Sequence, residues 1–446
     1  MNSVLKRIFP AMSILLCVVL ATASCGTSAS GGENAGGSTS AQSGTSAGKS
    51  SAVPGEKIKL KFYGKVVEDA STEEKLAMTQ EHFKDKYDID PIQVDWANMT
   101  TVIQTGIASG DPADAYFWWN NNMASWVKSN QALDLTSYLE DGNGEWKNTF
   151  VQSALDLGKI DGKYYNIPYN QTSSTILAND TLAKKLGITI PDNMTWDQFM
   201  EVCKDIKTKG GAGIFPFTVH KDWSIWVVDN GESSLAEAAG KLTEWSSGEV
   251  PTSDPIFAAS LKNTVDLYKN NYVYPGKGAL TSTLDQEKAA FAQGKVVMAA
   301  VVFSEVPGFQ ELAKKNGFEL KVVKWPSMGS KATIPGCSNG FFVPTNAKNP
   351  DASIDFLKYY TGAETQAVDA KNGIIPVNVN VQISDSLLND VMNNSGDVQV
   401  GADITQLGPK VNDYFRNEFV QSVVLDTAKL EDALKKLQTL IDEAKQ

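Results

Sequence analysis

The chain has few of the side chains on which metal and nucleophile chemistry usually depends. It contains only two histidines, His82 and His220, which are far apart in the sequence. Zinc sites and histidine-based triads need histidine held next to partner side chains. We therefore expect no metal, no other cofactor and no catalytic residue.

Cysteine is also scarce, with four in 446 residues. Only Cys203 and Cys337 lie beyond the N-terminal region, and a secreted chain of this size does not need disulfides. Phe199, Cys203 and Ile206 share one face of a predicted helix, which favours a buried free thiol at Cys203. A Cys203–Cys337 bridge is the alternative.

An excess of positive charge is lacking: 40 basic residues against 52 acidic ones give a net charge of −12. An acidic chain without a basic cluster is a poor partner for nucleic acid or for anionic lipid surfaces, whereas a neutral ligand is compatible with it. Arginine is scarce in the loops considered below, which disfavours capture of an amino acid through its carboxylate.

Long hydrophobic runs are absent except near the N-terminus, where Lys6 and Arg7 precede the apolar segment 8–21. The segment is too short to span a bilayer comfortably and is typical of a secretory signal, which we place at residues 1–24. Its small-residue ending before Cys25 resembles the lipobox of bacterial lipoproteins, although Thr22 stands where Leu is usual. The resemblance implies a diacylglycerol on Cys25; a plain secretory signal is the alternative.

Residues 25–55 are dominated by Gly, Ser, Ala and Thr. Such a segment buries too little apolar surface to offset its ordering entropy, so we expect a flexible linker. With the lipid on Cys25, it would hold the rest of the chain just outside the membrane, with no other membrane contact.

The remaining chain is longer than one hydrophobic core usually supports, so two lobes are expected. Alternating residues predict strands at 57–64, 92–96 and 113–119, separated by helices at 71–83 and 99–109. This order indicates a parallel α/β lobe. A second α/β lobe begins near Ile176; it has a capped helix at Thr195–Gln198, a strand at 213–219 and an amphipathic C-terminal helix at 428–445.

Aromatic and amide side chains follow the predicted strands. Tyr63 ends the first strand, and Trp118-Trp119-Asn120-Asn121 ends the third. Ligands bind beyond the carboxyl ends of parallel strands. Indole faces stack on the C–H face of a sugar ring, and amides bond its hydroxyls. These residues therefore predict a sugar site.

Several phrases in order resemble one family. They are GIASGDPADAYFWW, ALDLTSYL, IDGKYYNIPYN, LANDTLAKKLGI, TWDQFMEVCKDIK, FAQGKVVMA, NGFFVPTNAKNPDASIDFLKYYTGAETQ and GIIPV. Together they are similar to extracellular solute-binding proteins of carbohydrate ABC transporters, the family of maltose-binding protein. The resemblance covers Lys57 to about Val377.

The resemblance implies a two-lobed, hinged α/β fold of the periplasmic-binding-protein type (type II), each lobe a mainly parallel sheet with flanking helices. The N-terminal lobe would comprise 56–171 plus 337–380 and the C-terminal lobe 172–336 plus 381–446, with crossings near Gln171, Gly336 and residue 380. It also implies binding roles for Trp118, Asn121, Trp223, Asn170 and Gln171. Further candidates are Lys221, Asp222, Glu305, Ser338 and Asn339. Val302–Glu305 replaces a tryptophan usual in the family.

The implied function is capture of a sugar or oligosaccharide by a monomer and its delivery to the transmembrane permease of an ABC transporter at the extracellular face of the cell membrane. A tethered glycoside hydrolase is one alternative, because Glu68, Asp222 and Glu305 are possible cleft carboxylates. The same fold with a non-sugar solute is another.

Overall fold

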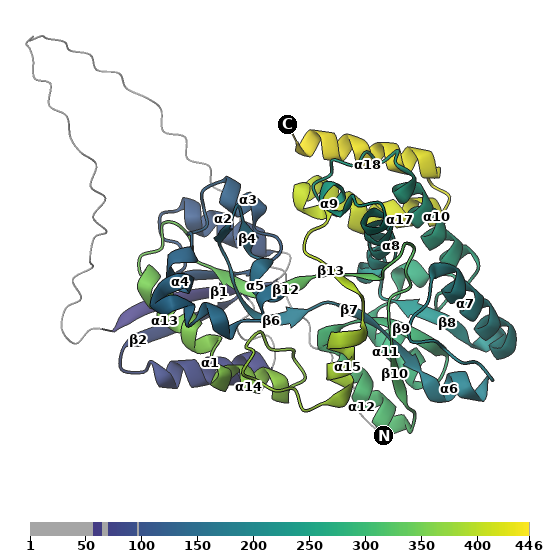
Figure 1. The fold of residues 1–446 in the computed structure, drawn as a ribbon, viewed down its shortest axis with the longest axis horizontal. Helices are drawn as coiled ribbons and strands as arrows, with labels where there is room; N and C mark the ends of the chain where they lie inside the picture. The colour runs from purple at the N-terminus through teal and green to yellow at the C-terminus, as the bar shows by residue number, and fades with distance from the viewer. Residues whose placement is uncertain (1–56, 65–69, 96–97, 446) are drawn as a thin grey trace, which may run out of the picture. The chain divides into compact units, whose positions relative to one another are not determined.

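The computed structural model describes residues 57–64, 70–95 and 98–445 (Figure 1). The predicted signal peptide, linker and lipid site Cys25 lie outside the described residues, as does Glu68. Residues 54–446 belong to one compact unit.

The first sheet has five strands in the order β2-β1-β3-β12-β6. They are β1 (Ile58–Gly64), β2 (Tyr87–Gln93), β3 (Ala115–Trp119), β6 (Ile167–Thr172) and β12 (Cys337–Phe342). The pairs β1–β2 and β1–β3 are parallel, but β12 runs antiparallel to both of its neighbours. A late segment of the chain thus lies between two early ones.

The second sheet has four strands in the order β10-β7-β9-β8. They are β7 (Ser174–Asn179), β8 (Phe215–Val219), β9 (Val296–Val302) and β10 (Leu320–Val323). Only β8–β9 is parallel. The prediction of mainly parallel sheets is therefore right for β2-β1-β3 and wrong for the second sheet, because β7 enters it directly from β6 and runs against both strands beside it.

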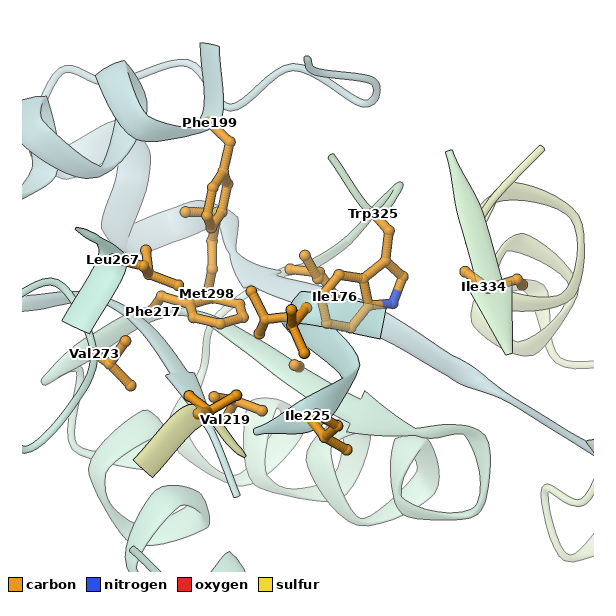
Figure 2. Packing of buried hydrophobic residues seen from close by; sticks show 14 of the residues in the cluster. Ile176, Phe199, Phe217, Val219, Ile225, Leu267, Val273, Met298, Trp325 and Ile334 are labelled. Carbon is orange, nitrogen blue, oxygen red and sulfur yellow. The ribbon is translucent and has the colours of Figure 1, made fainter. Parts of the chain in front are cut away.

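Each sheet has its own hydrophobic core. One core is built from residues between Leu60 and Tyr169 and between Phe341 and Val377; the other comes from residues between Ile176 and Ile441. In the second core, Phe199 of helix α7 packs edge-on against Phe217 of β8, next to Met298 of β9 (Figure 2). Burial of these aromatic and aliphatic side chains is the main source of stability for each sheet.

Helices cover both sheets (Figure 1). Those with the first core are α1 (Ala70–His82), α2 (Met99–Ala108), α3 (Ala124–Lys128), α4 (Thr136–Gly144), α5 (Gln152–Asp156), α13 (Pro350–Tyr360) and α14 (Ala363–Lys371). Those with the second are α6 (Asp180–Lys185), α7 (Trp196–Gly210), α8 (Ile225–Ala238), α9 (Leu242–Ser246), α10 (Pro255–Lys269), α11 (Leu284–Ala292), α12 (Val306–Asn316), α15 (Ser386–Asn394), α16 (Pro409–Tyr414), α17 (Val420–Val424) and α18 (Leu430–Ala444). Two small ladders complete the fold: β4 (Lys159–Ile160) with β5 (Lys163–Tyr164), and β11 (Thr333–Pro335) with β13 (Val398–Val400).

Local sequence signals were mostly reliable. The Thr195–Gln198 capping box is confirmed at the start of α7, and Cys203 is a fully buried free thiol on that helix. The strand predicted at 92–96 is wrong in position. The observed strand is β2, whose ladder with β1 runs from Ile58–Tyr87 to Gly64–Gln93. All seven residues of β1 are therefore paired with a segment that begins five residues before the predicted strand.

The chain passes between the sheets at closely bonded points. β6 leads through Ser173 directly into β7, and β11 leads through Gly336 into β12. The Gln171 N–H donates to the Ile375 carbonyl at 2.8 Å, and the Gly336 N–H donates to the Val400 carbonyl at 2.7 Å. The first bond ties one passage to the segment that precedes α15, and the second ties the other passage to β13, which follows α15.

In the part of the chain that the structure describes, none of the helices has the length and apolar character needed to cross a membrane. Nor do the described residues contain a group of three or more His, Cys, Asp or Glu side chains arranged to hold a metal ion.

Candidate ligand-binding site

A cavity of about 610 Å³ lies where the two passages meet elements of both cores. Its lining includes Thr172, Ser173, Pro335 and Cys337 from the passages themselves. The remaining walls come from the end of β3, from α8 and the turn before it, and from the segment 403–416. The volume is within the range of small-molecule sites.

The β3 wall carries Trp119, Asn121 and Asn122. Trp119 lies opposite Asn339 in the β3–β12 ladder, and Asn339 lies opposite Asn170 in the β12–β6 ladder. Directly opposed residues share a sheet face. Trp119 therefore stands in a row with two predicted amides, although neither Asn170 nor Asn339 lines the cavity.

Trp118 does not line the cavity, so the prediction that it supplies a stacking face is wrong. Successive strand residues point to opposite sides of a sheet, and Trp118 faces the core, where it is 6 % exposed. Its indole packs edge-on against Trp126 at 5.3 Å, and its N–H donates to the Asn122 carbonyl at 2.5 Å. The exposed aromatic of this pair is Trp119.

The lining also carries Trp223, one of the residues singled out from the sequence, together with Trp226 at the start of α8. The two indoles are stacked, with ring centroids 5.1 Å apart and planes 7° from parallel. Asp222 also lines the cavity, whereas its neighbour Lys221 does not; the Lys221 ammonium lies 3.5 Å from the Asp222 carboxylate. The stacked pair provides a flat apolar surface beside a carboxylate.

The other predicted residues do not line the cavity, and several of them have structural partners instead. Tyr63 packs edge-on against Tyr116, and the Asn120 side chain is fully buried and donates to the Ala154 carbonyl at 2.6 Å. Gln171 donates to the Pro376 carbonyl at 2.8 Å, and Glu305 accepts a hydrogen bond from Lys288. Ser338 is 1 % exposed. These residues were predicted because they lie near strand ends and passages in the sequence, but none of them belongs to the cavity wall.

Sequence reasoning missed the wall formed by residues 403–416. It contributes Asp403, Thr405, Gln406, Asn412, Phe415 and Arg416. The segment consists of a short 3₁₀ turn, α16 and the start of a π-helical turn, so it has no strong periodicity. One signal was available: Arg416 is the only arginine after Arg7.

Arg416 and Asp403 hold each other within this wall. The Arg416 guanidinium lies 4.0 Å from the Asp403 carboxylate and donates through Nε to Asn412 Oδ1 at 2.7 Å. Asp403 Oδ1 also accepts from the Thr405 N–H at 2.7 Å. Both charged groups are thus oriented by the protein before any ligand enters.

Asp229 of α8 is the other carboxyl in the wall that the sequence did not single out. It is 7 % exposed, and its buried Oδ1 has no hydrogen-bond partner among the described residues. Burial raises the pKa of Asp229 well above its ordinary value; the Asp403 charge raises it further and Arg416 opposes this. A donor or a cation that reached this carboxyl group from the cavity would oppose the shift and favour the ionised form.

Cys337 is a free thiol at the second passage. Burial raises the pKa of Cys337 to about 12, so the thiol is protonated at neutral pH and is a poor nucleophile. No bridge joins it to Cys203.

The chain matches the family model of bacterial extracellular solute-binding proteins over residues 64–367. A binding protein of Brucella abortus (strain 2308) is 23 % identical over 295 residues, which cover 64 % of this chain and 67 % of the relative.

Solved structures with the same fold are numerous. One, from a study of xylan utilization by Caldanaerobius polysaccharolyticus, has a TM-score of 0.71 and 20 % identity, and covers 86 % of this chain and 100 % of its own. An ABC substrate-binding protein of Listeria monocytogenes in complex with cycloalternan has a TM-score of 0.69 and 17 % identity, covering 87 % and 99 %. RafE of Streptococcus pneumoniae has a TM-score of 0.70 and 17 % identity, covering 89 % and 100 %. The match to the family model extends over more than half of the sequence, and the chain belongs to the bacterial extracellular solute-binding proteins.

Proposed function

We propose that the protein captures a sugar or oligosaccharide in the cavity between Trp119 and the Trp223–Trp226 pair and delivers it to the permease of an ABC transporter. The observation that carries this proposal is that tryptophans packed against both cores line one cavity together with amide and carboxylate side chains. Two proteins of the same fold were solved with cycloalternan and with raffinose, both carbohydrates.

The chemistry of these walls suits a polyhydroxylated ring. A sugar presents C–H groups on its faces and hydroxyls at its rim. Indole rings stack against the C–H faces. Asn121 and Gln406 can donate to or accept from the hydroxyls, and the carboxylates can accept from them. Withdrawal from water strengthens each of these polar contacts.

We propose no catalytic role for these side chains. A glycoside hydrolase needs two carboxyl groups on opposite sides of the cleaved bond. Of the carboxylates considered from the sequence, Asp222 lines the cavity, Glu305 is engaged by Lys288, and Glu68 lies outside the described residues. Asp229 and Asp403 both come from elements of the second core. Incubation with oligosaccharides should therefore release no new reducing ends.

We further propose that Cys25 carries the lipid that holds this monomeric protein at the outer face of the cell membrane. The lobes would move about the passages as units, with residues 56–171 and 337–380 in one and residues 172–336 and 381–446 in the other. Cys25→Ser should release the protein into the medium or leave it unlipidated. A processed variant that stays on the membrane would contradict the anchor.

The ligand class is tested by thermal unfolding of the purified protein with a panel of neutral mono- and oligosaccharides, with glycine and spermidine as non-sugar probes. A ligand at about 100 times its dissociation constant should stabilise the folded state by roughly 2.7 kcal/mol. We expect at least one carbohydrate to do so. Stabilisation by glycine or spermidine alone would overturn the proposal.

A further inference from the structure

The carboxyl group of Asp229 is the least satisfied polar group in the cavity wall. It is more than nine-tenths buried, it lines the cavity, and its Oδ1 has no hydrogen-bond partner among the described residues. A buried carboxylate without donors is costly, because it gives up its hydration and receives nothing in return. Because Asp229 lines the cavity, a ligand bound there is a possible source of the missing partner.

The charges around Asp229 do not supply that partner. Arg416 lies 4.0 Å from Asp403, so the guanidinium is shared with another carboxylate. Asp222 has its own cation in Lys221 at 3.5 Å. Glu232, one turn along α8, is fully buried and accepts a hydrogen bond from the Trp245 indole at 3.2 Å. Burial raises its pKa, which favours its neutral form, and a carboxyl group supplies no positive charge in either form. Asp229 is thus the carboxyl group of the cavity lining whose buried oxygen has no hydrogen-bond donor among the described residues.

The aromatic walls favour the same kind of partner. Trp119, Trp223, Trp226 and Phe415 all line the cavity. The negative face of an aromatic ring attracts a cation, most strongly for tryptophan and most effectively when water is excluded. A neutral ring would gain from stacking alone, whereas a positively charged ring substituent would gain from both the π faces and the carboxyl group.

We propose that the ligand carries a cationic group that pairs with Asp229, and that the preferred sugar class is therefore an amino sugar with a free ammonium. This inference rests on the proposed function and names its ligand class more closely. The ammonium donates to Asp229, the rest of the ring stacks between the walls, and Arg416 with Asn412 remains available for ring oxygens.

A proton should be exchanged when such a ligand binds. Burial and Asp403 raise the pKa of Asp229 and so favour its protonated form, whereas an incoming ammonium favours the ionised carboxylate. The carboxyl proton then passes to the buffer. A neutral sugar leaves Asp229 protonated and releases no proton, so the two ligand classes differ in a measurable quantity.

The test is calorimetric titration of the wild-type protein with matched pairs: glucosamine against glucose, galactosamine against galactose, and chitosan oligosaccharides against cello-oligosaccharides. Each is run below the pKa of the sugar amine and in buffers of different ionisation enthalpy. We expect an amino member to bind at least about ten-fold tighter than its neutral partner, with net proton release, since charge-assisted bonds are roughly twice as strong as neutral ones.

Asp229→Asn keeps the shape of the side chain and removes its charge. It should reduce the amino-to-neutral preference by about ten-fold and abolish proton release, whereas the exposed control Asp390→Asn on α15 should retain both. If Asp229→Asn fails to fold, proton release by the wild type still shows whether an amino sugar ionises a carboxyl group on binding. A neutral sugar that binds as tightly as its amino counterpart, without proton release, would overturn the charge assignment and leave sugar capture standing. Binding of no carbohydrate of either kind would overturn both.

Discussion

Trp118 and Trp119 are adjacent residues with opposite environments, one in the core and one in the cavity wall. Trp119→Ala should weaken ligand binding by roughly 1.5–4 kcal/mol because a stacking face is lost, with a small effect on unfolding. Trp118→Ala, the matched control, should lower the free energy of unfolding by ~3–5 kcal/mol. Titration calorimetry and melting of the free proteins separate the two. If Trp119→Ala bound the ligand with wild-type affinity, the binding site would have to lie elsewhere.

Trp223→Ala should behave like Trp119→Ala, because its indole forms the opposite wall. The stacked neighbour Trp226 keeps part of the apolar surface, so the loss of affinity should lie toward the lower end of that range. A loss of stability as large as that of Trp118→Ala, without a loss of affinity, would assign this indole to the core.

Glu287 of α11 gives the unfolding equilibrium a pH dependence. It is 1 % exposed, accepts from the Ser282 hydroxyl at 3.0 Å, and burial raises its pKa from 4.5 to about 8. Between these values the folded state keeps a proton that the unfolded state has lost, so the free energy of unfolding falls as pH rises from about 4.5 to about 8 and then levels off. At lower pH both states are protonated and the cost disappears.

Glu287→Gln should remove this slope, so the melting temperature of the variant relative to wild type should rise from pH 5 to pH 8.5. The exposed control Glu249→Gln should show no such trend. Parallel pH profiles for wild type and Glu287→Gln would show that the carboxyl ionises normally in the folded state.

At the scale of elements, helices α1 and α14 are joined by a buried ion pair. The Lys75 ammonium lies 2.6 Å from the Asp369 carboxylate, and the two side chains are 0 % and 1 % exposed. Ser71 and Gln366 also donate to Asp369. Because the carboxylate would remain buried without its cation, Lys75→Met should cost about 3–5 kcal/mol of unfolding free energy.

The exposed pair Lys59–Asp90, at 3.0 Å, is the control for this prediction. Lys59→Met should cost no more than about 1 kcal/mol in denaturant unfolding. Equal effects of the two substitutions would show that the α1–α14 joint does not depend on its charge pair.

Elements with a strong local pattern were predictable from the sequence. β1 alternates apolar and polar residues, α7 begins at a capping box, and α18 has Leu434, Leu437 and Ile441 buried on one face. The position of β2 and the antiparallel setting of β7 depend on partners far along the chain, which no local pattern encodes. The 403–416 wall was missed for the same reason, because irregular turns reveal their role only when the second core brings them to the cavity.

At the scale of the whole molecule, we propose that the two cores move against each other about the passages at Ser173 and Gly336. A ligand that contacts both aromatic walls favours a closed arrangement over an open one. Small-angle scattering should therefore give a smaller radius of gyration at saturation than without ligand. The same comparison with a non-binding sugar is the control, and an unchanged radius at saturation would count against closure.

The place of β12 also determines the order in which the chain can fold. This strand joins β3 to β6, yet it is synthesised after the whole of the second sheet, whose strands all lie between Ser174 and Val323. Until Phe342 is available, β3 and β6 have no common partner, and the first sheet stays open. The N-terminal part of the chain thus remains unfinished while the later part emerges.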